Sequence, residues 1–177
     1  MNRGPEAIEC FQRAVRLYPN YFQAHNSLGA ALYSDGKIPE AIEQFRLTLQ
    51  YDPHNLEARW NLGRLLFATG DVELAIPQLE AAIQIEPRLV DAHNALGDVY
   101  RATGRFQDAI EQYDTALRLK SDFAPAYVGR AAALAAAGRS DEAAATAEKG
   151  IEIARSSQAK RPLRNSLRSG SSTFEMN

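Results

Sequence analysis

The apolar positions of this chain recur at helical spacing, in segments separated by short polar stretches that contain glycine or proline. A small residue precedes a larger apolar or aromatic residue by four positions, as in Ala41 and Phe45 or Ala109 and Tyr113. Two positions four residues apart lie on the same face of an α-helix. The pattern therefore predicts a chain of amphipathic helices.

These helices repeat with a period of 34 residues. Several kinds of residue keep this period independently of one another, which chance does not explain. They are prolines at Pro19, Pro53 and Pro87, glycines at Gly36, Gly70, Gly104 and Gly138, Leu-Gly pairs at Leu28-Gly29, Leu62-Gly63 and Leu96-Gly97, and alanines at Ala7, Ala41, Ala75, Ala109 and Ala143. Such a period indicates stacked units that share one continuous core.

Each unit is predicted to contain two antiparallel helices joined by a short turn. The glycine at Gly36 and its equivalents is expected to end the first helix in a conformation that a side chain would resist. The glycine of each Leu-Gly pair is expected to let the neighbouring helix approach closely. The proline at the end of each unit closes the second helix.

The period divides the chain into four full units, preceded by half a unit. The full units are 22–55, 56–89, 90–123 and 124–157, and the half unit is 1–21, with a second helix only. The face that its missing first helix would cover is then open. We interpret the half unit as a truncated piece of a longer array, with another covering element as the alternative, and self-association through this face as a further hypothesis. The last unit departs from the pattern at Arg130, Ala147 and Arg155, which is typical of a terminal capping repeat.

The segment 158–177 differs from the array in composition. It is rich in serine and contains four basic residues and one acidic residue, and Pro162 and Gly170 oppose one continuous helix. We predict a disordered basic tail. A short helix docked on the last unit, or a basic contact for an acidic partner or a membrane, is the alternative.

Composition and motifs exclude several classes of function. The formal net charge of -2 gives no overall attraction to nucleic acid. No apolar run is long enough to span a bilayer and the first residues lack a secretory signal, so we expect a cytoplasmic protein. The single cysteine, Cys10, excludes an internal disulfide and a cysteine-based zinc site.

A search for catalytic chemistry finds no phosphate loop, nucleophile elbow or zinc-protease motif. His25 and His93 share one repeat position two units apart, roughly 20 Å if packed helix layers are about 10 Å thick, so they cannot hold one metal ion. We interpret them as surface or half-buried packing residues. The sequence thus predicts no enzyme activity, no cofactor and no metal.

The Leu-Gly pair, the Ala-x-x-x-Phe/Tyr pair and the proline, at this period, resemble the tetratricopeptide repeat (TPR) family over residues 1–157. Ala-His-Asn-x-Leu-Gly, beginning at Ala24 and Ala92, is similar to the arrays of O-linked N-acetylglucosamine transferases and of bacterial multi-repeat proteins. The resemblance implies an all-α, right-handed α-solenoid of stacked antiparallel helix pairs. It also implies a scaffold or adaptor that binds a protein or peptide. The alternative is a substrate-recruiting or regulatory part of a larger enzyme such as a glycosyltransferase.

In this family the first helices line a concave face, and the resemblance therefore implies which residues would face a ligand. They are Asn26, Tyr33, Trp60, Asn61, Arg64, Phe67, Asn94, Asp98 and Arg101. Aromatic and Arg side chains are frequent in binding hot spots, and an Asn amide can both donate to and accept from a peptide bond. The alternative is that the aromatic residues pack between helices and the Asn residues are only solvated. The mixture of Asp and Arg argues against a nucleic-acid ligand.

Two recognition modes of the family do not fit the residues of this chain. Members that hold a C-terminal carboxylate use a set of Lys, Asn and Arg, of which only Asn61 is matched here, and Asp91 has the wrong charge. Glycosyltransferase-type arrays carry a ladder of Asn at the sixth residue of each unit. Asn61 occupies that position, but Ser27 and Ala95 do not continue the ladder.

Overall fold

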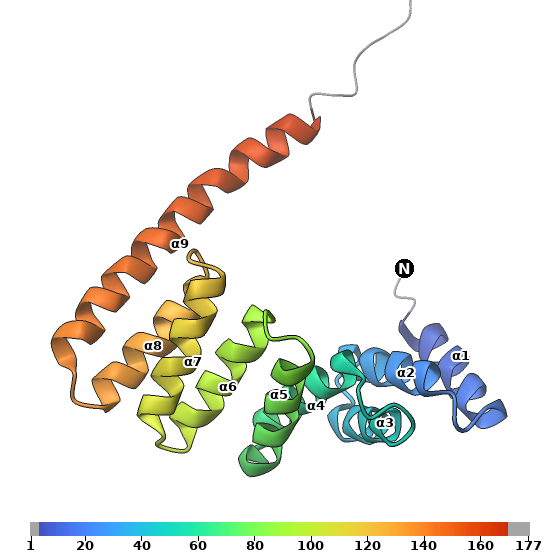
Figure 1. Cartoon of the computed structure of the whole chain (residues 1–177). Helices are drawn as coiled ribbons and strands as arrows, with labels where there is room; N and C mark the ends of the chain where they lie inside the picture. The colour runs from blue at the N-terminus through green and yellow to red at the C-terminus, as the bar shows by residue number, and fades with distance from the viewer. Residues whose placement is uncertain (1–3, 170–177) are drawn as a thin grey trace, which may run out of the picture.

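The computed structural model describes the backbone of residues 4–169 and the side chains of residues 4–156. Within this range the chain forms nine α-helices and no strand. They are α1 (Gly4–Leu17), α2 (Phe22–Ser34), α3 (Ile38–Tyr51), α4 (Leu56–Thr69), α5 (Val72–Ile85), α6 (Val90–Ala102), α7 (Phe106–Leu119), α8 (Ala124–Ala136) and α9 (Ser140–Ser169). Figure 1 shows them stacked in chain order along a curved array, an all-α solenoid, with α1 at one end and α8 and α9 at the other.

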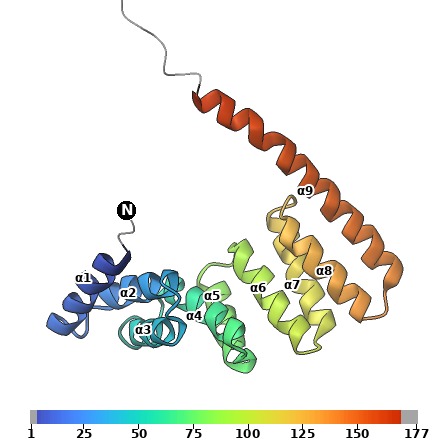
Figure 2. The same ribbon diagram turned by 180° about the vertical axis from the view of Figure 1, so that it is seen from behind.

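The helices pack in antiparallel pairs, α2 with α3, α4 with α5, α6 with α7 and α8 with α9. The first helices of these pairs begin at Phe22, Leu56, Val90 and Ala124, at the predicted period. Successive first helices also touch, since α4 contacts α6 and α6 contacts α8. The same order is visible from behind in Figure 2. The first helices therefore form a continuous row on one side of the stack.

The turn inside each pair depends on a glycine with a left-handed backbone. Gly36, Gly70, Gly104 and Gly138 have φ angles of 79°, 89°, 75° and 78°. The residue after each glycine donates its N–H back to the last turn of the first helix, as Lys37 does to the Leu32 carbonyl at 2.9 Å. This bond satisfies a carbonyl that the helix end would leave without a partner. The predicted role of these glycines is confirmed.

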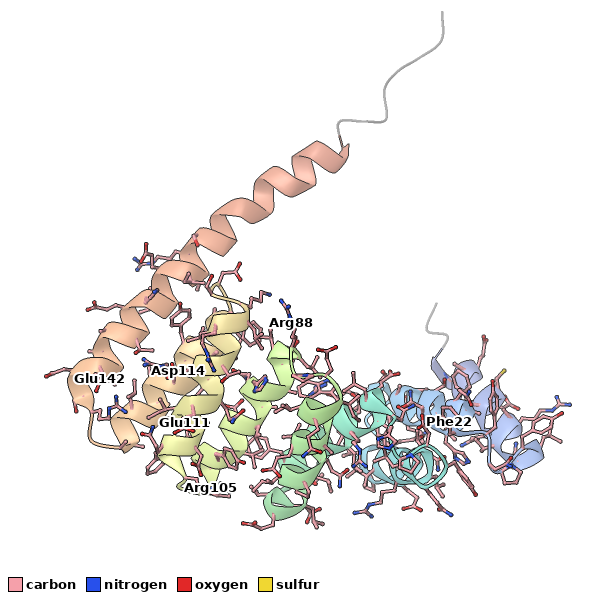
Figure 3. The ribbon with its side chains drawn as sticks, viewed as in Figure 1. Phe22, Arg88, Arg105, Glu111, Asp114 and Glu142 are labelled. Carbon is pink, nitrogen blue, oxygen red and sulfur yellow. The ribbon has the colours of Figure 1, made fainter. Side chains whose placement is uncertain are left out.

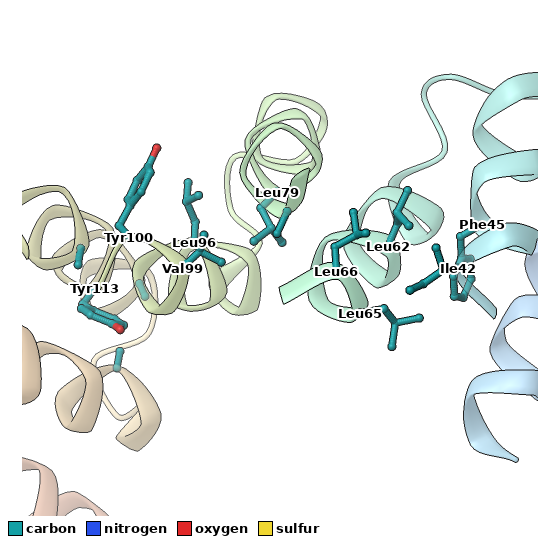
Figure 4. Close-up of a cluster of buried hydrophobic side chains, with 14 of the residues drawn as sticks. Ile42, Phe45, Leu62, Leu65, Leu66, Leu79, Leu96, Val99, Tyr100 and Tyr113 are labelled. Carbon is teal, nitrogen blue, oxygen red and sulfur yellow. The ribbon is translucent and has the colours of Figure 1, made fainter. Parts of the chain in front are cut away.

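The core runs through the whole stack and contains one large side chain from each of three second helices. Phe45, Leu79 and Tyr113 are 0% exposed. A Cβ atom added to Gly29 would lie 2.9 Å from the Phe45 ring, and one added to Gly97 would lie 2.8 Å from the Tyr113 ring. Figure 4 shows these buried side chains reaching from helix to helix, while charged residues such as Arg88 and Glu142 lie exposed on the outside (Figure 3). The helix pairs can pack this closely because glycine leaves room for the ring.

Adjacent units are joined by the fourth residue of each first helix. The Nε2 of His25 donates to the Pro19 carbonyl at 2.8 Å, and its Nδ1 lies 2.8 Å from Oε1 of Gln44. Equivalent contacts to the preceding turn are made by Arg59, His93 and Tyr127. His25 is 5% and His93 6% exposed. The interpretation of these histidines as surface or half-buried residues is wrong, because each is buried between the turn before it and the second helix after it.

The last helix is longer than the other second helices. Helix α9 runs from Ser140 to Ser169, past Pro162, and Figure 1 shows its far end projecting from the stack. The irregular backbone expected for residues 158–169 is therefore helical, in a segment that contains many good helix formers such as Gln158, Ala159 and Leu163. Residues 170–177 lie outside the described part of the chain. In the part that is described, no helix combines the length and the apolar content needed to cross a membrane.

Candidate functional site

A groove of about 650 Å³ lies on the row of first helices, between α4, α6 and the start of α8. We call it the α4–α6 groove. Its lining residues are Trp60, Arg64, Phe67 and Ala68 from α4, Asp91, Asn94, Ala95 and Asp98 from α6, and Phe123 and Pro125 at the start of α8. Five of the nine predicted ligand-facing residues thus line one groove.

The α4 wall of the groove is an aromatic cluster held together by an arginine. The guanidinium carbon of Arg64 lies 5.2 Å from the centre of the Trp60 ring and 5.8 Å from that of Tyr33. Nη2 of Arg64 also donates to the Tyr33 hydroxyl at 3.3 Å. Cation–π contacts of this kind fix a guanidinium over a ring. Arg64 therefore ties α2 to α4 through Tyr33, and no described carboxylate forms an ion pair with it.

The α6 wall contains a half-buried carboxylate, Asp98. Its Oδ1 accepts from the Tyr113 hydroxyl at 2.7 Å and its Oδ2 accepts from Nδ2 of Asn94 at 3.2 Å. The nearest cation is Arg101, whose Nη2 is 3.8 Å away. Burial raises the pKa of Asp98, and the Tyr113 hydrogen bond and the Arg101 charge lower it in part. The partners in the chain therefore do not fully offset the desolvation of this carboxylate.

Tyr113 connects the groove to the core. Its ring is fully buried while its hydroxyl reaches Asp98 from α7. Burial, together with the hydrogen bond to Asp98, raises the pKa of the Tyr113 hydroxyl, so it remains a donor across the physiological range. A core side chain thus holds Asp98 in place.

Asn26 and Asn94 each use one amide N–H in a hydrogen bond within the chain. Nδ2 of Asn26 donates to Oε2 of Glu57 on the next first helix at 2.7 Å, and Nδ2 of Asn94 donates to Asp98. The amide oxygens of both are buried, and they have no hydrogen-bond partner among the described residues. Asn61 is half-buried outside the groove lining. One of the two amide N–H donors at Asn26 and at Asn94 is thus already bonded within the chain.

The groove also contains residues that were absent from the predicted ligand-facing set. Phe123 and Pro125 line it from the turn into α8. Phe123 and Pro125 fall at the end of one unit and the second residue of the next, so they reach the groove only because α8 begins beside α6. The sequence feature that could have predicted the place of Phe123 in the groove is that it is an aromatic residue next to a unit boundary.

Replacing Asp98 by Asn is expected to change how stability depends on pH. The folded chain holds the Asp98 proton more tightly than the unfolded chain, because burial raises this pKa. The free energy of unfolding of the wild type, relative to that of Asp98→Asn, is therefore greatest at pH values below the pKa that Asp98 has in the unfolded chain. The wild type loses that advantage as the pH rises through the folded pKa. Urea unfolding of both proteins at a series of acidic pH values measures the difference, and a difference that rises with pH contradicts this assignment.

Family models of the tetratricopeptide repeat match residues 54–122 and 94–159, and a model of the TPR repeat matches residues 1–36. Together these matches cover most of the chain. The chain belongs to the tetratricopeptide repeat family. This confirms both the family and the all-α solenoid predicted from the 34-residue period.

Solved structures of TPR proteins are similar over nearly the whole chain. A crystal structure of MamA is 27% identical with a TM-score of 0.83, covering 90% of this chain and 98% of that one. A second MamA structure is 29% identical with a TM-score of 0.82, covering 89% and 85%. YrrB, described as a TPR protein with an unusual peptide-binding site, is 20% identical with a TM-score of 0.80 over 86% and 78%, a likeness of fold alone. No curated protein sequence matches the chain.

Proposed function

We propose that this TPR array is a protein-interaction scaffold that binds a peptide segment of its partner in the α4–α6 groove. The observation that carries the proposal is the grouping of Trp60, Phe67 and Phe123 from two successive units around one hollow. Aromatic side chains in a recess contribute most of the binding energy of many interfaces. Membership of the TPR family supports the scaffold role.

The open shape of the groove, which reaches across three units, suits an extended segment. It is an open channel of about 650 Å³ across three units, with apolar rings on one wall and carboxylates on the other. The rings would supply apolar contact with side chains, while Asp91 and Asp98 would select their charge. No cluster of His, Cys, Asp and Glu among the described residues is arranged to hold a metal. The proposal is one of binding.

The tryptophan of the groove provides a direct test, since Trp60 is the single tryptophan of the chain. A random dodecapeptide library would be selected on the immobilised protein, and the selected peptides titrated against Trp60 fluorescence. We expect the emission to change on binding and Phe67→Ala to weaken binding about tenfold.

The matched control for Phe67→Ala is Ile151→Ala on α9, which removes an exposed apolar side chain away from the groove. Circular dichroism of both variants checks that the array stays folded. Selected peptides that leave the Trp60 emission unchanged and bind Phe67→Ala as tightly as wild type would place the binding site elsewhere, and the groove proposal would fail.

A further inference from the structure

The charged side chains of the α4–α6 groove differ in the contacts that they already make within the chain. On the α4 wall, the guanidinium of Arg64 is stacked on Trp60 and hydrogen-bonded to Tyr33. On the α6 wall, Asp98 has two uncharged donors and a cation no nearer than 3.8 Å. The lining of the groove thus carries two carboxylates, Asp91 and Asp98, and one guanidinium, Arg64, which is already stacked on an aromatic ring.

The Asp91 side chain has no partner in the described part of the chain because a pair of residues found in the preceding units is not repeated at this position. In the preceding pair of units, Asn26 donates to Glu57 at 2.7 Å. One period later, Trp60 occupies the position of Asn26, and Asp91 occupies that of Glu57. Among the described residues, no ion pair or hydrogen bond engages the exposed Asp91 side chain. The substitution of a ring for an amide thus leaves a carboxylate beside an aromatic wall.

The Asp98 carboxylate can accept a further hydrogen bond. An ionised carboxylate offers about four lone-pair sites, and the chain uses two of them, for Tyr113 and Asn94. Burial disfavours the charge of Asp98, so a cation brought into the groove would offset a desolvation that Tyr113 and Arg101 offset only in part. The two carboxylates are seven residues apart on α6, about 10 Å along the helix.

The opposite, α4 wall of the groove is aromatic, with Arg64 as its charged residue. Trp60 and Phe67 are half-buried, and Phe123 closes the end, where Lys120 already lies 5.3 Å from its ring centre. A ligand that fills the groove meets rings on one side and carboxylates on the other.

Resting on the proposed function, we propose that the α4–α6 groove selects peptide segments in which a Lys or Arg adjoins an apolar side chain. The basic group pairs with Asp98 or Asp91, and the apolar side chain packs on Phe67 and Trp60. Acidic segments are rejected, because their carboxylates would face the α6 wall.

The test uses the same dodecapeptide library, with Asp91→Asn, Asp98→Asn and the double variant as additional targets. Peptides selected on wild type are expected to be enriched in Lys and Arg beside apolar residues. Asp98→Asn should weaken their binding about tenfold, because it removes a charge-assisted hydrogen bond in a half-buried site. Asp91→Asn should weaken it about threefold, because Asp91 is exposed.

The matched control is Glu57→Gln, which removes a carboxylate at the equivalent repeat position outside the groove lining. It should leave the affinities unchanged. For the tightest peptide, replacing its basic residue by norleucine in a double-mutant cycle with Asp98→Asn should show that the two losses are not additive.

The outcomes separate the inference from the proposed function. Binding that depends on Phe67, with no enrichment of basic residues or no loss on Asp91→Asn/Asp98→Asn, overturns the charge selection and leaves the groove as the site. Binding that is indifferent to Phe67, or a library that yields no binder, overturns the groove itself and the selection with it. Enrichment of acidic residues also overturns the inference.

Discussion

Replacing Tyr113 by Ala is expected to lower the free energy of unfolding by about 4 kcal/mol, as truncation of a fully buried aromatic residue does. The ring is 0% exposed and fills the space beside Gly97 and Gly129, so its loss opens a cavity between three helices. The variant also removes the donor that holds Asp98 in the groove. Urea unfolding followed by circular dichroism measures the change.

Tyr113→Phe separates the ring from its hydroxyl. It keeps the buried ring and removes only the hydrogen bond to Asp98, so we expect a loss of about 1 kcal/mol. If Tyr113→Ala were no more damaging than Tyr113→Phe, the ring would not be the element that packs α6, α7 and α8 together, and this description of the core would be wrong.

Gly129→Ala is expected to destabilise the array by about 2 kcal/mol, although Ala is normally the better residue inside a helix by about 1 kcal/mol. The added Cβ would collide with the ring carbons and hydroxyl of Tyr113. That ring has no free direction in which to move, since it is buried and its hydroxyl is bound to Asp98. The same unfolding measurement tests the prediction.

Two comparisons identify the cause of the Gly129 effect. Gly104→Ala places a Cβ where nothing lies within 4 Å, so only the left-handed backbone at φ 75° is strained, by about 1 kcal/mol. In a Tyr113→Leu background, where the ring atoms are gone, Gly129→Ala should cost much less than in wild type. An unchanged cost in that background would exclude the ring as the obstacle.

The fold was predictable because its signals are local and repeated. The positions of Gly36, Gly70, Gly104 and Gly138 predicted the turns, and the Leu-Gly pairs predicted the close approach that Phe45 and Tyr113 exploit. Each of these features depends on residues within one unit. The 34-residue period then extends a single unit to the whole array.

The partners of polar side chains were not predictable in the same way. Asn26 binds Glu57, 31 residues away on the next first helix, and His25 binds Gln44, 19 residues away across the pair. The first contact depends on how successive units rotate against each other and the second on how the two helices of a pair face each other, and a repeat pattern specifies neither. The sequence gives one hint of these contacts. Gln44, Gln78 and Gln112 recur with the same 34-residue period as His25, Arg59 and His93.

The way the helices pack also determines how this chain is expected to fold. Extensive contacts join helices that are adjacent in the chain or one helix apart, within the described residues. Folding therefore needs no closure of long loops, so it should be fast and should spread along the array from whichever unit forms first. An array built in this way can lose one end without the other, so loosening α7 and α8 should leave the helices from α1 to α5 folded.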